Sequence, residues 1–214
     1  MKHLNYFKTF EAIIMPNDIT IDEELKSFDD FVDWGKENNV DVVKYEEFYD
    51  SLDDENKKTA PPEDSYNHPF FALFHPIRKK PMFVVSDEKV FKHLPMNEII
   101  ADIIGHEIIH QKQDDKRGDL EIVLPNPEIK KDYFSNKDEI MAFSWTIAND
   151  ISKISDSFEE AIDKFKKNKL ATPGVVRLAN EIINNVDEEV KKRYNKYIYL
   201  YLKEIFRENK SKES

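Results

Sequence analysis

Apolar residues recur at three- and four-residue steps in several stretches of the chain, which is the spacing of amphipathic helices. Two such stretches, residues 1–15 and 20–35, predict helices on either side of Pro16. Residues 41–49 fit either a short strand or another helix, because periodicity alone does not separate the two there. We therefore expect residues 1–60 to form an N-terminal helical lobe that packs on the rest of the chain.

Two short runs rich in aromatic and β-branched residues, 70–75 and 82–86, flank a polar turn with prolines at its edges. This pattern predicts a β-hairpin. The segment before it, 51–67, is rich in Asp, Glu, Lys, Asn and Pro and predicts a solvated loop. An exposed edge strand of the hairpin could bind an extended peptide, or the hairpin could simply cover the helix that follows.

That next helix is predicted to start near Asn97, a suitable cap residue, and to end near Gly118. Gly105, in its middle, costs up to about 1 kcal/mol relative to Ala in a helix, so another element should pack closely against that turn. The apolar residues on the helix recur at three- and four-residue steps, which predicts burial along most of its length: Ile99, Ile100, Ile103, Ile104 and Ile108.

A second helix is predicted to open at Ser135, where Ser135 and Asp138 fit a capping box. Residues 155–214 predict three more helices, followed by a disordered tail: 157–167, 173–186 and 187 to about 207, with the tail from 208. The last helix carries a Tyr-rich stripe, which is ordinarily core. The alternative is a surface for a homodimer or another protein partner.

Composition narrows the classes of partner and of ligand. The net charge is −11, which argues against nucleic acid or an anionic membrane as partner, since either needs a basic patch. There is no cysteine, so only His, Asp and Glu remain as likely metal ligands. No apolar run has the length of a signal peptide or membrane span, and we expect a cytoplasmic protein.

His106, Glu107 and His110 form an HExxH motif inside the predicted helix. On a helix the two histidines lie one turn apart on one face, where both imidazoles can bind one Zn²⁺ and Glu107 can reach a water beside it. Glu139, in the first turn of the next predicted helix, is our choice for the third ligand. Asp138 is the competitor, but it is better placed to accept backbone hydrogen bonds at the helix start.

A metallopeptidase also needs a group that stabilises the oxyanion of the tetrahedral intermediate. Tyr133 is the best candidate because it lies shortly before the helix that carries Glu139. His68, His75 and His93 are the alternatives, and one sequence does not select among them.

The HExxH motif, followed by Glu139-Ile140-Met141-Ala142, resembles the gluzincins, zinc metallopeptidases whose third ligand is a Glu on the next helix. The E-x-x-A form is similar to the compact branch that includes the bacterial and phage ImmA/IrrE-like peptidases. The resemblance covers about residues 70–150. It implies His106, His110 and Glu139 as zinc ligands and Glu107 as general base, within a zincin-like core.

The match has departures. Phe143 stands where a thermolysin-like E-x-x-x-D motif has its Asp, and Asp114 and Arg117 stand where a metzincin has Gly and its third His. The 28 residues between His110 and Glu139 are more than thermolysin-like enzymes use.

Together these features predict an α+β, mainly α-helical protein. Its zincin-like core should span residues 61–154, between the N-terminal lobe and a C-terminal helical extension at 155–214. The predicted function is a zinc-dependent peptidase acting on a peptide or protein. The alternatives are a non-catalytic binding or structural protein that retains a metal site, and a metal hydrolase acting on a non-peptide bond.

Overall fold

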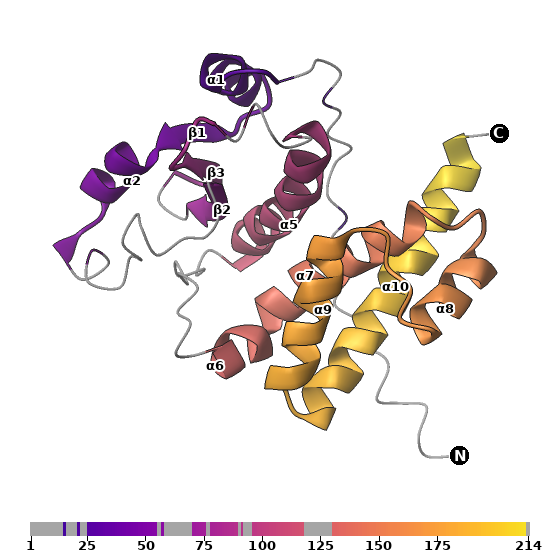
Figure 1. The fold of residues 1–214 in the computed structure, drawn as a ribbon. Helices are drawn as coiled ribbons and strands as arrows, with labels where there is room; N and C mark the ends of the chain where they lie inside the picture. The colour runs from indigo at the N-terminus through magenta and orange to yellow at the C-terminus, as the bar shows by residue number, and fades with distance from the viewer. Residues whose placement is uncertain are drawn as a thin grey trace.

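A computed structural model describes residues 15, 21, 25–54, 57, 70–75, 78–89, 91, 96–117 and 130–212. The chain is mainly helical with one small β-sheet, as predicted (Figure 1). The described elements are α1 (Phe28–Glu37), β1 (Asp41–Lys44), α2 (Tyr45–Ser51), β2 (Phe70–His75), β3 (Lys80–Val85), α5 (Met96–Arg117), α6 (Lys130–Ser135), α7 (Lys137–Ser152), α8 (Phe158–Lys166), α9 (Pro173–Asn185) and α10 (Glu188–Lys212).

The sheet has the strand order β1-β3-β2. Strands β2 and β3 are antiparallel and form the predicted hairpin, whereas β1 runs parallel to β3. The ambiguous stretch 41–49 contains both alternatives, a strand followed directly by a helix. The predicted boundary at residue 60, between the N-terminal lobe and the core, falls between β1 and β3. These two strands pair in one sheet, so the segments on either side of the boundary share that sheet.

Both faces of the sheet are covered, because side chains along a strand alternate between its faces. Phe83 and Val85 belong to a cluster with residues of α1 and α5, whereas Met82 and Val84 belong to one with residues of α2. All four side chains are buried. The β3 strand is therefore the centre of a small layered unit, with helices on either side of the sheet.

Helix α5 lies between this sheet and the C-terminal helices (Figure 1). Its residues Ile100, Ile104 and Ile108 pack in the cluster on the sheet side, and Ile109 packs in the cluster of the C-terminal helices. Of the isoleucines expected to be buried, Ile100, Ile104 and Ile108 are buried and Ile103 is half-buried, while the side chain of Ile99 is not described. A helix buried on two sides has fixed side-chain positions, which suits it to carry a site.

The predicted cap at Asn97 is wrong, because this residue lies inside α5. Its side-chain oxygen accepts the backbone N–H of Leu25 at 3.2 Å, and its amide donates to the carbonyl of Ile21 at 3.3 Å. Asn97 thus ties the segment before α1 to the start of α5. The end of the helix at Arg117 agrees with the prediction, and Gly118 lies outside the described residues.

Helix α1 begins later than predicted. Ser27 caps it by accepting the backbone N–H of Asp30 at 3.1 Å, and residues 25–27 are not helical. The apolar spacing from 20 onward therefore overestimated the helix, because Leu25 is buried without being helical. Most of the helix predicted for residues 1–15 and of the loop predicted for 51–67 lies outside the described residues. Ser51, at the start of the predicted loop, is the last residue of α2.

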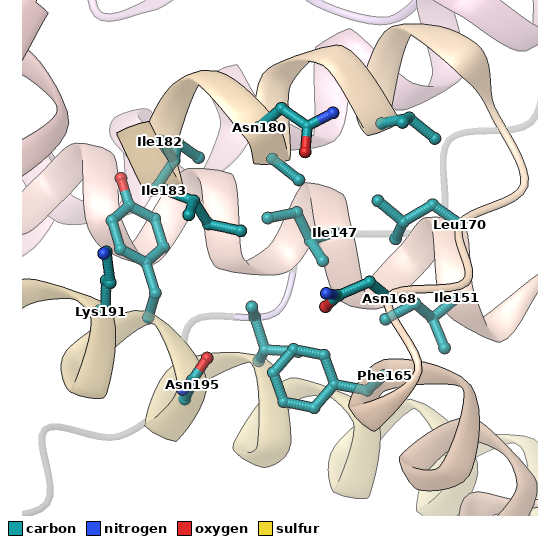
Figure 2. A pocket seen from close by; sticks show the side chains of 14 residues that line it. Ile147, Ile151, Phe165, Asn168, Leu170, Asn180, Ile182, Ile183, Lys191 and Asn195 are labelled. Atoms are coloured by element: carbon teal, nitrogen blue, oxygen red, sulfur yellow. The ribbon is translucent and has the colours of Figure 1, made fainter. Parts of the chain in front are cut away.

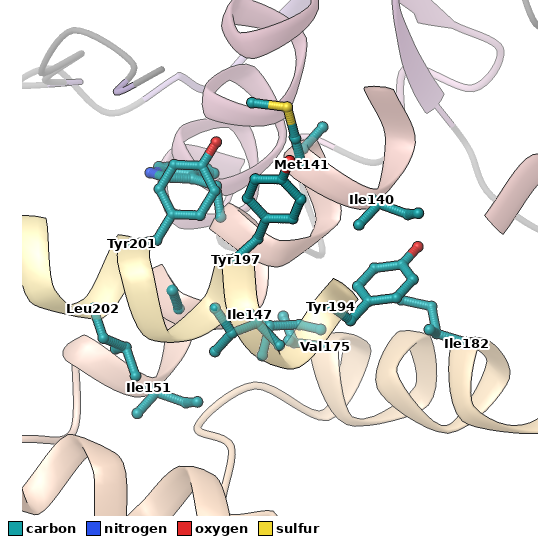
Figure 3. Packing of buried hydrophobic residues seen from close by; sticks show 14 of the residues in the cluster. Ile140, Met141, Ile147, Ile151, Val175, Ile182, Tyr194, Tyr197, Tyr201 and Leu202 are labelled. Atoms are coloured by element: carbon teal, nitrogen blue, oxygen red, sulfur yellow. The ribbon is translucent and has the colours of Figure 1, made fainter. Parts of the chain in front are cut away.

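The three predicted C-terminal helices are confirmed as α8, α9 and α10, but α10 continues to Lys212. The tail predicted from residue 208 is therefore helical for most of its length. Figure 3 shows Tyr194, Tyr197 and Tyr201 of α10 among buried residues of α7, as expected of core. These tyrosines are buried within the chain, and a partner of this helix remains a prediction. Among the described helices, none is long and apolar enough to cross a membrane.

Candidate metal centre

Two helices bring three buried polar side chains together. His106 and His110 lie one turn apart on α5, and Glu139 lies in the first turn of α7. The two imidazole Nε2 atoms are 3.1 Å apart. The two Glu139 oxygens lie 3.4 Å from His106 Nε2 and 3.5 Å from His110 Nε2. These three residues, chosen from the sequence, form a group that could hold a metal ion.

The spacing of these atoms can be tested against zinc. Ligand atoms about 2.0–2.1 Å from a tetrahedral ion are separated from one another by about 3.3 Å. The separation of 3.1 Å between the two Nε2 atoms lies close to that value, as do the distances of 3.4 Å from His106 Nε2 to Oε2 of Glu139 and 3.5 Å from His110 Nε2 to Oε1. Moreover, Oε2 of Glu139 is buried and has no hydrogen-bond partner among the described residues, a costly arrangement that a cation would relieve. The residues therefore fit zinc.

The close approach of α5 to α7 depends on Gly105. A Cβ atom built there would lie 1.9 Å from Cη2 of Trp145, a buried residue of α7. The indole ring therefore occupies the space that any other residue would fill on the turn beside His106. This contact is the close packing that Gly105 predicted from the sequence. Because Trp145 is on the same helix as Glu139, the contact also sets the distance between the candidate ligands.

Gln113 orients one of the imidazoles. Its Oε1 lies 3.0 Å from Nδ1 of His110, and its Nε2 donates to the carbonyl of Asp138 at 3.3 Å. Since the amide N–H donates to α7, Oε1 accepts a hydrogen bond from Nδ1–H of His110, which leaves Nε2 of His110 facing Glu139. Sequence analysis missed this residue, although its position three residues after His110 puts both on one helix face.

Phe143 takes the place of the Asp that an E-x-x-x-D motif would supply. Its ring centroid lies 4.5 Å from that of His106 at an interplanar angle of 52°. The His106 ring is thus held by aromatic packing where thermolysin-like enzymes are expected to have a carboxylate. The polar side chain that contacts an imidazole here is instead Gln113, which hydrogen-bonds to His110.

His110 and Glu139 have shifted pKa values at this site. Burial lowers the pKa of His110, but the negative charge and hydrogen bond of Glu139 outweigh it and raise the pKa to about 9. Burial raises the pKa of Glu139, yet the two imidazoles, His110 first, lower it to about 2. Glu139 is therefore a carboxylate throughout the physiological range, the form in which it can bind a cation.

Glu107 is buried beside this group, and burial raises the pKa of its carboxyl above the ordinary value. The backbone of Phe74 hydrogen-bonds this carboxyl and partly offsets the rise. The sheet register explains the contact: Phe74 faces Pro81 of β3, which has no N–H to give to the ladder. At such a non-hydrogen-bonded position the backbone groups of Phe74 point away from β3, toward Glu107.

The hairpin is also anchored to α5 at its turn. The ammonium of Lys79 pairs with the buried carboxylate of Asp114, and Gln111 donates to the carbonyl of Lys79 at 3.0 Å. Asp114 and Gln111 lie on the turn of α5 that follows His110. These contacts hold β2 in place beside the candidate metal ligands.

Tyr133 lies on α6, half-buried, and its ring centroid is 5.8 Å from that of Phe143. Burial raises the pKa of its hydroxyl, and the negative charge of the nearby Glu139 raises it further. The hydroxyl is therefore protonated near neutral pH and can donate a hydrogen bond. Its proximity to Glu139 fits the predicted part in oxyanion stabilisation, which stays a prediction.

The competing residues have other partners or positions. Asp138 lies at the start of α7, and its backbone N–H donates to the side chain of the cap residue Asn136 at 2.8 Å. The predicted cap at Ser135 is wrong, because this residue ends α6. His75 is buried at the end of β2, and its Nδ1 accepts the backbone N–H of Arg78 at 3.3 Å.

His68 and His93 lie outside the described residues. The distances among the candidate metal ligands do not depend on these two histidines, because every atom that defines the distances is described.

Comparison of the chain with protein-family models, with curated proteins and with solved structures finds no match. Its function must therefore be argued from the site.

Proposed function

We propose that this protein is a zinc-dependent peptidase with a gluzincin-like centre. The observation that carries the proposal is the convergence of His106, His110 and Glu139 from two helices at separations that suit zinc. Glu107 follows the first ligand directly and is buried in the same place, where a general base is needed. The resemblance of the HExxH and E-x-x-A motifs to the gluzincins supports the same assignment.

Each residue then has a role. Zinc held by the three ligands would supply Lewis-acid chemistry, making water more acidic and polarising a carbonyl group. Glu107 accepts the proton of the attacking water and delivers it to the leaving amine. Its raised pKa brings it nearer to the operating pH, which favours such two-way transfer. Tyr133 is placed to donate a hydrogen bond to the oxyanion that develops on the carbonyl.

The sheet supports a peptide as the substrate. Among the described residues, β2 lies at an edge of the sheet, and it contacts α5. Phe74 lies opposite Pro81, which has no N–H, so Phe74 and, two residues earlier, Ala72 occupy non-hydrogen-bonded positions of the ladder, and their backbone groups point outward from this edge. An extended peptide could pair with β2 and pass beside Glu107.

The first experiment measures metal. Elemental analysis of the purified protein should find one zinc per chain, and Glu139→Gln and His106→Ala should lower its content severalfold. Equal zinc in the wild type and both variants would remove these residues from a metal site and end the proposal.

The second experiment measures hydrolysis. Mass spectrometry of a peptide library treated with the wild type should show cleavage, and Glu107→Gln should reduce its rate about 10²–10⁴-fold while zinc content is unchanged. Glu159→Gln is the matched control, because this carboxylate is exposed on α8. Undiminished cleavage by the Glu107→Gln variant would refute the mechanism, and bound zinc without any cleavage would favour a non-catalytic role or a non-peptide substrate.

A further inference from the structure

A cavity lies among the C-terminal helices, apart from the candidate metal centre. It has a volume of about 290 Å³ and is lined by residues of α7, α9, α10 and the connection between α8 and α9 (Figure 2). Ile147, one of the α7 residues that line it, lies eight residues after Glu139, which is about two helical turns. Nothing in the proposed peptidase chemistry uses this space.

The cavity is divided into an apolar floor and a polar mouth. The floor is formed by buried aliphatic side chains, among them Ile147, Ile151, Ile182 and Ile198. The mouth carries three exposed amides and one half-buried cation: Asn168, Asn180, Asn195 and Lys191. No carboxylate is among the described residues that line it. An occupant would therefore bury an apolar body and meet hydrogen-bonding groups and positive charge at the opening.

Two large apolar side chains at the mouth are left in water. Val176 and Ile183, both on α9, are 38% and 46% exposed although they line the cavity. They are two of only five large hydrophobic residues that are exposed in the described part of the chain. A bound molecule with an apolar body would cover part of this surface, a further reason to expect one.

We propose that this cavity binds a small amphipathic anion, such as a medium-chain carboxylic acid, with its chain on the isoleucine floor and its head at Lys191. The volume holds about ten water-sized groups, since each water occupies about 30 Å³, and this matches an acid of about ten non-hydrogen atoms. The amides of Asn168, Asn180 and Asn195 supply donors for the carboxylate oxygens. Lys191 already pairs with Glu188 at 2.8 Å, but Glu188 is strongly exposed, so the ammonium can turn toward a bound anion.

Octanoate is a suitable probe, and the isoleucine methyl groups report where it binds. In a ¹H–¹³C spectrum of protein labelled at isoleucine methyls, titration should shift the signals of the floor residues saturably. Signals of Ile100 and Ile104, which lie in the cluster beside the sheet, should stay in place. The absence of saturable shifts up to about 5 mM octanoate would overturn the proposal, because a weaker affinity is not that of a built site. Shifts of equal size at all isoleucines would overturn it as well.

Two variants test the position and the charge. Ala179→Phe places a ring inside the cavity and should abolish the shifts, whereas Arg177→Phe adds the same ring at an exposed position of α9 outside the lining. Unmoved Ile100 and Ile104 signals confirm that each variant is folded. Undiminished octanoate shifts in Ala179→Phe would refute the site.

Lys191→Met removes the cation and keeps the length of the side chain. It should weaken octanoate about two- to fivefold and leave the affinity for 1-octanol unchanged, because an exposed ion pair contributes modestly. Equal affinities for octanoate in the wild type and in this variant would refute the anionic head. Because none of these measurements involves zinc or hydrolysis, they stand or fall separately from the proposed function.

Discussion

Replacing Gly105 by Ala tests the contact on which the candidate site depends. In an open helix this change stabilises by about 1 kcal/mol, because Ala is the better helix former. Here the new methyl group would lie 1.9, 2.3 and 2.7 Å from three ring atoms of Trp145, which is only 6% exposed. Carbon atoms in contact sit about 3.5–4.0 Å apart, so the ring and α5 must separate by about 1.5 Å.

The expected result is a net loss of stability. Overpacking a core costs typically about 1–3 kcal/mol, and such a short contact with a rigid ring belongs at the upper end. After subtraction of the helix-propensity gain of about 1 kcal/mol, Gly105→Ala should lower the free energy of unfolding by about 1–2 kcal/mol. The separation would also spread the candidate ligands beyond the spacing that suits zinc, so zinc affinity should fall together with stability.

Urea unfolding of the protein treated with a chelator measures the first effect, and competition with a chromogenic chelator measures the second. Gly174→Ala is the matched control, because a Cβ there meets nothing within 4 Å, and this variant should be as stable as the wild type or more so. The double variant Gly105→Ala/Trp145→Leu should recover part of the loss, since the ring is removed. If Gly105→Ala alone is as stable as the wild type, the close packing of α5 on α7 is refuted.

Four further predictions concern other parts of the site and fold. Gln113→Leu should weaken zinc about 10–100-fold in a chelator competition, because His110 loses the partner that orients it, and an unchanged affinity would show that Gln113 is dispensable. Because Glu139 raises the pKa of His110 to about 9, zinc should displace about one proton at pH 7, which calorimetry in buffers of different ionisation enthalpy measures. The raised pKa of His110 also stabilises the folded, chelator-treated protein. This stabilisation is full below pH 6.5 and should be lost as the pH rises through about 9. A free energy of unfolding that stays constant over this pH range would contradict it. Asp150→Ala should lower the free energy of unfolding by about 2–3 kcal/mol in thermal unfolding, because the buried carboxylate accepts two backbone N–H groups before α9, the shortest at 2.7 Å; a change below about 0.5 kcal/mol would refute this.

Local patterns in the sequence were enough for most of the elements. The hairpin, the helix with the HExxH motif and the three C-terminal helices all follow from periodicity, prolines and turn residues, which act over a few positions of the chain. The errors lie at the ends of elements. Ser135 and Asn136 are both good caps, and only the break between α6 and α7 decides that Asn136 is the one used.

The candidate ligands were also accessible from the sequence, because the four-residue spacing of His106 and His110 is a property of any helix. Glu139 was a choice between two adjacent carboxylates, and the sequence favoured it only through cap chemistry and the family resemblance. The packing of α7 against α5 turns Glu139 inward to the two imidazoles, while Asp138 stays at the helix start.

Patterns along the chain are enough to place most of the helices and strands and to name the residues that are chemically able to hold a metal. What lies against them depends on how the elements pack: β1 beside β3, Trp145 in the space left by Gly105, and Gln113 between His110 and the start of α7. The difference is one of range along the chain. Helix periodicity and caps depend on neighbours within about four residues, whereas these contacts join residues 25 or more positions apart and form only when whole elements pack together.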